Sequence, residues 1–251
     1  MKNFFNAKQF VAYRSLGYSL IVRLSRLALL LSSSLLNIAF ELFMYTTVLG
    51  KVQINYAISG IILGLVAGEM MSETSFNLYY SKFKGHLYSI LASPVDDHII
   101  LLSYISSGIL RTTIMLTIAM ILIQFTIGFK IAIIYPLQFI ILMFLIAIFF
   151  SMIGLVEGIY AESFMQSGFA SRFIFSFLST FSGSLAPIPQ SRAIVTKFLP
   201  YNPVYYMNNM IRYYISGESK FIPNNMLLLQ IALVNVFLFA IVMQCFKSLR
   251  K

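Results

Sequence analysis

Six long apolar runs, separated by polar segments, constrain this chain more than any other feature. A helix needs about 20 mostly apolar residues to cross the hydrocarbon core of a bilayer, and a membrane β-strand needs about 10 with alternating polarity. The runs are continuous, so they indicate helices. They are Leu27–Leu49, Ile54–Met71, Ile99–Ile127, Ile131–Val156, Gly168–Ala186 and Met226–Phe246. The sequence therefore predicts an all-α polytopic membrane protein with six transmembrane helices.

The composition agrees with a membrane location. The chain is 59% hydrophobic and 10% charged, whereas soluble domains carry about 25% charged residues. A net charge of +10 would suggest nucleic-acid binding in a soluble protein. In a membrane protein, Lys and Arg instead collect at the cytoplasmic edge beside anionic lipid. Their distribution predicts that both termini are cytoplasmic. Cys245 is the only cysteine, so an internal disulfide is impossible.

Two segments outside the runs have interfacial character. Residues 1–26 mix aromatic, aliphatic and basic residues, which predicts an amphipathic helix along the inner leaflet, with a solvated tail as the alternative. No small-residue cleavage site follows this segment, so a cleavable signal peptide is not expected. The loop Pro187–Asn225 holds most of the prolines and several tyrosines. It is too polar to span the bilayer, which favours short interfacial helices.

The second run contains a glycine pattern. Gly60, Gly64 and Gly68 recur at four-residue intervals and share one helix face. Small residues at this spacing let another helix backbone approach closely. The pattern favours tight helix packing, with a flexible hinge as the alternative.

Four ionisable residues lie in or beside the apolar runs: Glu41, Glu69, Glu73 and Arg111. A charge in the bilayer centre costs at least ~2.5 kcal/mol. Counting ~1.5 Å per residue from the inner ends of their runs places Glu41 and Arg111 at similar depths. An ion pair between them is therefore a hypothesis. Glu69 and Glu73 either line an inward vestibule or reach headgroup water, and the second alternative is favoured.

The sequence shows no marked catalytic or metal site. It lacks the Gly-x-x-x-x-Gly-Lys-[Ser/Thr] loop that cradles nucleotide phosphates, so the chain is not expected to hydrolyse ATP. It also lacks a His-Glu-x-x-His pair and any Cys/His cluster with metal-ligand spacing. We therefore assign no catalytic residue and no bound metal.

A polar, basic segment separates the second and third runs. It reads Lys-Phe-Lys-Gly-His-Leu-Tyr-Ser-Ile-Leu-Ala-Ser-Pro-Val over residues 82–95. A segment held at the membrane surface by a helix on each side can receive force from a soluble partner. This segment is therefore a candidate contact for another protein.

Three motifs together resemble a known family. The first is the segment 82–95, and the second is Arg111 within Gly-Ile-Leu-Arg at residues 108–111. The third runs from Ser182 and Gly183 through Pro187 to Leu-Pro-Tyr-Asn-Pro-Val-Tyr-Tyr at residues 199–206 and on to Arg212. In this order they resemble the ABC-2 type permeases, the membrane subunits of one class of ABC exporters. The chain looks most similar to the small bacterial inner-membrane permeases of the nodulation and drug-resistance exporter group.

The resemblance implies a single transmembrane domain over residues 1–251, in the bacterial inner membrane. It also implies a permease dimer, with spans one and five facing each other, above cytoplasmic ATPase subunits that hold ATP and Mg. No cofactor is expected on this chain, and no nucleic-acid partner. The coupling contact with the ATPase would involve Lys82, Lys84, Gly85, Leu87, Leu91, Ser93 and Pro94. The outer-loop motif would comprise Gly183, Pro187, Asn202, Pro203, Tyr206 and Arg212.

The expected function is export of an amphipathic, lipid-linked or drug-like substrate, because apolar and aromatic walls offer few fixed polar contacts. Two other classes of protein are alternatives. A secondary transporter predicts inverted repeats or broken helices, and a membrane-embedded enzyme predicts polar residues converging at one depth. The sequence favours neither.

Overall fold

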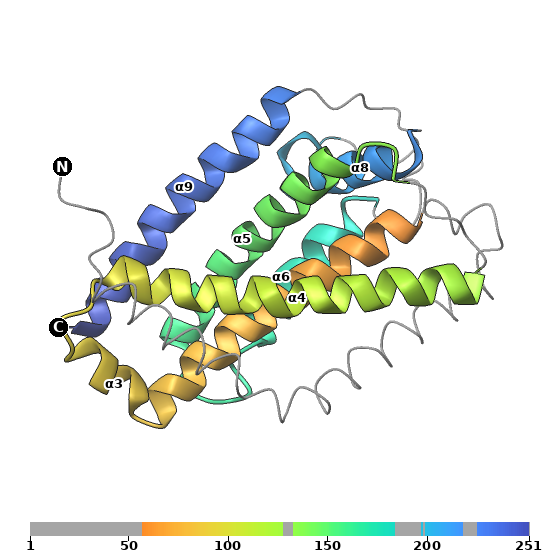
Figure 1. Cartoon of the computed structure of the whole chain (residues 1–251). Helices are drawn as coiled ribbons and strands as arrows, with labels where there is room; N and C mark the ends of the chain where they lie inside the picture. The colour runs from red at the N-terminus through yellow and green to blue at the C-terminus, as the bar shows by residue number, and fades with distance from the viewer. Residues whose placement is uncertain (1–56, 128–132, 184–196, 198, 218–224, 251) are drawn as a thin grey trace.

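The computed structural model describes residues 57–127, 133–183, 197, 199–217 and 225–250 (Figure 1). The regular elements in these ranges are all helical, so the predicted all-α class is confirmed there. The helices are Ala57–Phe83, α3 (His86–Leu91), α4 (Asp97–Ile127), α5 (Pro136–Tyr160), α6 (Phe169–Thr180), α8 (Pro203–Ser216) and α9 (Asn225–Lys247). Short 3₁₀ turns, η2 (Leu199–Tyr201) and η3 (Ser248–Arg250), precede α8 and follow α9.

Four of these helices are long and apolar enough to cross a membrane, namely Ala57–Phe83, α4, α5 and α9. They correspond to the second, third, fourth and sixth predicted spans. The first predicted span, Leu27–Leu49, and the amphipathic helix predicted over 1–26 lie outside the described residues. The fifth contains α6, whose 12 residues extend only about 18 Å, against about 30 Å of hydrocarbon. The count of six spans is therefore not confirmed.

Glycine and proline set several helix boundaries. Gly85 precedes α3 with φ 74°, a left-handed conformation that other residues adopt only with strain. Pro136 and Pro203 begin α5 and α8, where the missing backbone N–H removes no helical hydrogen bond. The helix α8 also falls within the loop for which the sequence predicts short helices.

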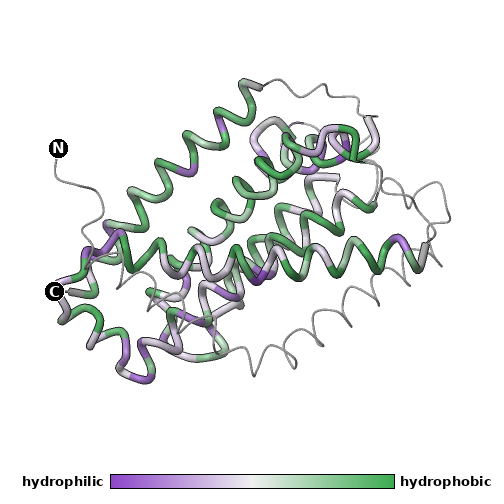
Figure 2. Tube along the Cα trace, in the orientation of Figure 1, coloured by the Kyte–Doolittle hydropathy of each residue, from purple (hydrophilic) through white to green (hydrophobic). Residues whose placement is uncertain are grey.

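The helix α5 lies at the centre of the bundle, where it packs against α4, α6, α8 and α9. One apolar cluster joins α5 to the Ala57–Phe83 helix and α8. A second cluster joins α3 to the adjoining ends of α4, α5 and α9. By contrast, only 11% of the most apolar 18-residue stretch of α9 is buried inside the bundle, against 61% of the corresponding stretch of α5. Figure 2 shows that most residues of α9 are hydrophobic and that hydrophilic residues lie at the turn before α3.

A close backbone contact joins α5 to the Ala57–Phe83 helix. A Cβ atom on Gly154 would overlap the backbone of Met71, and one on Gly158 would lie 2.8 Å from the Ser75 carbonyl oxygen. Both glycines are therefore required by the approach of the two helices. The glycine face predicted from the second run packs more loosely. A Cβ on Gly64 would lie 3.8 Å from the Phe175 ring, and one on Gly68 would meet no described atom within 4 Å.

Candidate functional site

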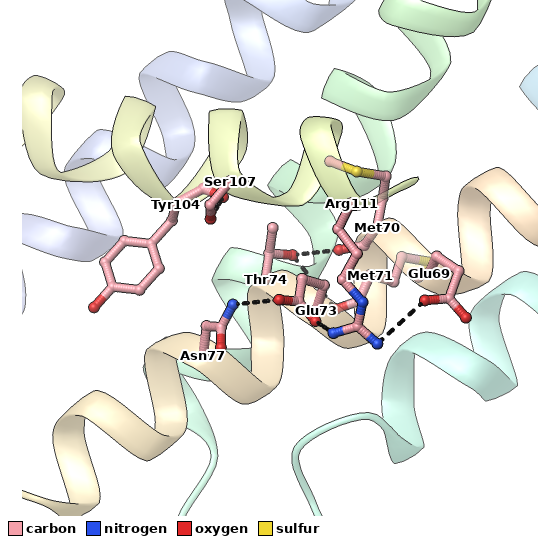
Figure 3. Close-up of polar contacts among 9 residues, drawn as sticks. All are labelled: Glu69, Met70, Met71, Glu73, Thr74, Asn77, Tyr104, Ser107 and Arg111. Carbon is pink, nitrogen blue, oxygen red and sulfur yellow. Dashed lines mark hydrogen bonds and ion pairs between the residues drawn. The ribbon is translucent and has the colours of Figure 1, made fainter. Parts of the chain in front are cut away.

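A charge cluster joins α4 to the Ala57–Phe83 helix (Figure 3). Arg111 of α4 donates a hydrogen bond to the Glu73 carboxylate, and its Nη2 lies 3.7 Å from Glu69 Oε2. Asn77 Nδ2 donates to the other Glu73 oxygen at 2.7 Å. The charged side chains are only 14–17% exposed. Because isolated buried charges are strongly unfavourable, the guanidinium and the two carboxylates stabilise one another.

This arrangement differs from the environment favoured for the two acids. Both Glu69 and Glu73 face Arg111 (Figure 3), whereas the sequence favoured side chains that reach headgroup water. The helix continues to Phe83, so both acids lie well inside its length and are mostly buried beside Arg111. Glu41 lies outside the described residues, so its pairing with Arg111 stays a prediction. The spacing of Glu69 and Glu73 on one face was the available signal for a shared cation.

The segment 82–95 forms a helical knob at one end of the bundle (Figure 1). A turn at Lys84 and Gly85 leads from the long helix into α3, and the fully buried Leu87 anchors α3 in the second apolar cluster. Phe83 and Tyr88 remain 74% and 58% exposed. The other residues predicted for coupling close the knob. Leu91 is the half-buried last residue of α3, Ser93 Oγ donates to the Ile90 carbonyl oxygen at 2.5 Å, and Pro94 is exposed.

Lys82 connects the base of this knob to α5. Its Nζ donates hydrogen bonds to the carbonyl oxygens of Ile159 at 2.9 Å and Ala161 at 2.6 Å. The last carbonyl groups of a helix lack intrahelical partners and carry partial negative charge, so an ammonium group is stabilised there. Lys84 instead places its Nζ 4.5 Å from the centre of the Tyr80 ring. Of the two predicted basic contacts, Lys82 is therefore already engaged within the chain.

The junction between α5 and α6 is held from two sides. Glu157, near the end of α5, accepts a hydrogen bond at 2.9 Å from the backbone N–H of Ala170 in the first turn of α6. Phe76 of the Ala57–Phe83 helix stacks on Phe164 with ring centres 5.1 Å apart. Its ring also lies against Gly168, whose φ of 101° starts α6. Sequence reasoning missed Glu157, although an acid directly after an apolar run was a usable signal.

The outer-loop motif lies at the opposite end and fastens α8 (Figure 1). Asn202 accepts from the Val204 N–H at 3.0 Å, which caps α8, and donates to the Leu178 carbonyl of α6 at 2.8 Å. Arg212 donates to Asn209 at 3.1 Å and to Ser59 of the Ala57–Phe83 helix at 3.2 Å. The remaining members are less connected. Pro203 starts α8, Tyr206 packs edge-on against Tyr205, Gly183 has φ 65°, and Pro187 lies outside the described residues.

Comparison with known proteins identifies the family. Residues 12–215 match the ABC-2 type transporter family. The inner membrane transport permeases YadH of Escherichia coli K12 and Shigella flexneri are each 22% identical to this chain over 163 residues. The match covers 64% of this chain and 62% of each relative, slightly less than two thirds of the relatives' own length. The family expected from the three motifs is thereby confirmed, and the chain belongs to the ABC-2 type transporter family.

Proposed function

We propose that this chain is the permease subunit of an ATP-driven exporter in the bacterial inner membrane, with both termini cytoplasmic. Its α3 knob docks on a cytoplasmic ABC ATPase subunit, which binds and hydrolyses ATP with Mg. The observation that carries the proposal is the build of the knob. Leu87 fixes it to the bundle while Phe83 and Tyr88 project outward. The membrane domains of this family lack ATPase activity, so an external source of energy is required.

The knob has the properties of a force-bearing contact. Exposed aromatic side chains are frequent energetic centres of protein interfaces, and Phe83 and Tyr88 stand on either side of the Lys84–Gly85 turn. A contact that transmits force must also be stiff. The burial of Leu87 among residues of α4, α5 and α9 supplies that stiffness. A displacement of α3 therefore acts on the bundle as a whole.

The motion passes from α3 to α6 through two described contacts. Lys82 holds the end of α5, and Glu157 on the last turns of α5 holds the start of α6. Nucleotide binding on the partner would shift an existing equilibrium between two helix packings, inward-open and outward-open. In this scheme α6 is the helix that responds, and α8 holds the opposite end.

The exposed face of α6 supports a permease dimer around the transport path. Phe169, Phe173 and Phe177 recur every four residues, so they share one face, and they are 71%, 66% and 57% exposed. A continuous exposed aromatic stripe marks an interaction surface. We propose that this face meets a second permease copy and the substrate, and that the substrate is amphipathic, lipid-linked or drug-like.

The docking role is tested with the double variant Phe83→Asp/Tyr88→Asp. Both side chains are exposed, so the variant should fold and insert normally. The ATPase activity that copurifies with it should be far lower than the activity that copurifies with the native chain. The measurement is nucleotide hydrolysis in the complex purified from its own host membrane, together with the circular-dichroism melting curve. The matched control is Tyr201→Asp, which changes an 84% exposed aromatic residue at the opposite end.

Two harsher variants extend the test. Leu91→Asp and deletion of residues 84–91 should also abolish ATPase association and transport while the chain still inserts. Undiminished ATPase activity in the complex of the double variant would overturn the docking role of α3.

A further inference from the structure

A pocket of about 570 Å³ lies between the second half of α5, the start of α6 and the second half of α9. Its volume falls within the range of small-molecule sites, about 300–1,000 Å³. The walls are mainly aliphatic, with Ile153 and Val156 from α5, Ile174 from α6, and Leu238 and Ile241 from α9. The pocket therefore favours an apolar chain.

The pocket opens on the outer surface of the bundle. Ile174 and Ile241 line it and are 40% and 37% exposed, and Tyr160 at its end is 62% exposed. Both α5 and α9 are long and apolar enough to span the membrane. A ligand would therefore enter sideways from the bilayer, which restricts it to membrane-soluble molecules.

The end of the pocket nearest α3 is acidic. Glu157 and Glu162 line it together with Gln166. Gln166 is committed to the loop, because its side-chain oxygen accepts the backbone N–H groups of Glu162 and Ser163 at 2.9 and 3.3 Å. Lys82 interacts electrostatically with Glu162, but its hydrogen bonds go to backbone carbonyl groups of the α5 end. Ionised carboxylates only accept hydrogen bonds, so they favour a cationic group that donates.

We propose that this pocket binds a phospholipid with a primary ammonium headgroup, drawn from the leaflet on the α3 side. An acyl chain follows the aliphatic walls, and the ammonium group meets the carboxylates of Glu157 and Glu162. Phosphatidylethanolamine has these features. A choline headgroup carries the charge without an N–H donor, and a glycerol headgroup leaves the lipid anionic, so both should bind more weakly. Under the proposed function the leaflet on the α3 side is the cytoplasmic leaflet. Only this assignment rests on the proposed function.

The lipid is identified by photo-crosslinking in the full chain. A benzophenone amino acid replaces Ile241 in the pocket, or Val236, which is 70% exposed on the same helix and outside the pocket. The protein is placed in nanodiscs with equal amounts of phosphatidylethanolamine, phosphatidylcholine and phosphatidylglycerol. Mass spectrometry of the adducts should show several-fold enrichment of phosphatidylethanolamine at position 241 and the bilayer composition at position 236. The same distribution at both positions would overturn the proposal.

Two variants locate the recognition within the pocket. Glu162→Gln removes one carboxylate and should reduce the phosphatidylethanolamine enrichment several-fold. Ala170→Phe fills the pocket while keeping the backbone N–H that donates to Glu157, and it should lower the total lipid adduct. Leu233→Phe adds the same ring on α9 at a 61% exposed position outside the pocket, and it should not. Unchanged enrichment in Glu162→Gln would overturn headgroup recognition by Glu162. Because crosslinking requires no ATPase, failure here leaves the docking test of α3 unaffected.

Discussion

The Ala57–Phe83 helix is joined to its neighbours by two very different seams. Toward α5 the seam is close-packed, because Gly154 and Gly158 let the backbone approach Met71 and Ser75 within contact distance. Toward α4 the seam carries Arg111 with Glu69 and Glu73. One seam is determined by shape and the other by charge.

The difference indicates which seam can rearrange. Glycine has no side chain that could change its conformation to keep contact when the helices move. Close-packed interfaces also resist continuous deformation. Long charged side chains can keep a partner while their helices move by one or more ångströms. Lys82 also ties the Ala57–Phe83 helix to the end of α5. We therefore expect the Ala57–Phe83 helix and α5 to move as one body, and the charged seam to accommodate any shift of α4 relative to this pair.

The largest effect on stability should come from Arg111→Ala. The change leaves Glu69 and Glu73 close together without their cation, and loss of one partner from a buried pair costs about 3–5 kcal/mol. The free energy of unfolding in mixed micelles measures the loss. The matched control is the triple variant Arg111→Met/Glu69→Gln/Glu73→Gln, which removes every charge and should recover most of the stability. A triple variant as unstable as Arg111→Ala would contradict the charge explanation.

A smaller effect is expected at the glycine seam. Gly154→Ala adds one methyl group where the backbone of Met71 leaves no space, and overpacking of this kind costs about 1–3 kcal/mol. Gly68→Ala is the matched control, because its methyl group meets no described atom within 4 Å. A helical Gly→Ala change without a clash stabilises by roughly 0.5–1 kcal/mol. The two variants should therefore shift the melting temperature in opposite directions, and equal shifts would contradict the tight seam.

Hydropathy located the long helices but ended the second one too early. It predicted an end at Met71 because Ser72, Glu73 and Thr74 follow. These polar groups are satisfied inside the bundle: Glu73 meets Arg111 and Asn77, and Thr74 meets backbone carbonyl groups. The hydropathy pattern of one helix does not show which polar groups on other helices will pair with its polar side chains. Polar residues therefore appeared to mark a boundary where they mark an interface.

The same limit explains the remaining differences at the site. The depth count proposed Glu41 as a partner of Arg111, which stays a prediction because Glu41 lies outside the described residues. It did not find the described partners Glu69 and Glu73, because depth alone does not specify which helices are neighbours. Glycine spacing drew attention to the second run, but the glycines that meet another helix backbone are Gly154 and Gly158 of α5. The short motifs identified residues with structural roles that the sequence analysis did not specify. Gly85 forms the turn before α3 and Asn202 caps α8, and both roles follow from local backbone chemistry.

The smallest effect should come from Thr74→Val, which tests whether polarity contributes to the close-packed seam with α5. Thr74 Oγ1 lies 2.7 Å from the Met70 carbonyl oxygen of its own helix and 3.2 Å from the Ser151 carbonyl oxygen of α5. A hydroxyl group has one proton and can satisfy only one of them at a time. Valine keeps the shape and loses the hydrogen bond, so we expect the free energy of unfolding to fall by about 0.5–1.5 kcal/mol.

Thr74→Ser is the converse control, since it keeps the hydroxyl and removes the methyl group. If shape dominates this seam, Thr74→Ser should destabilise at least as much as Thr74→Val in unfolding measurements. A clearly larger loss for Thr74→Val would mean that the seam with α5 is held by a hydrogen bond as well as by packing, and the contrast with the α4 seam would be weaker.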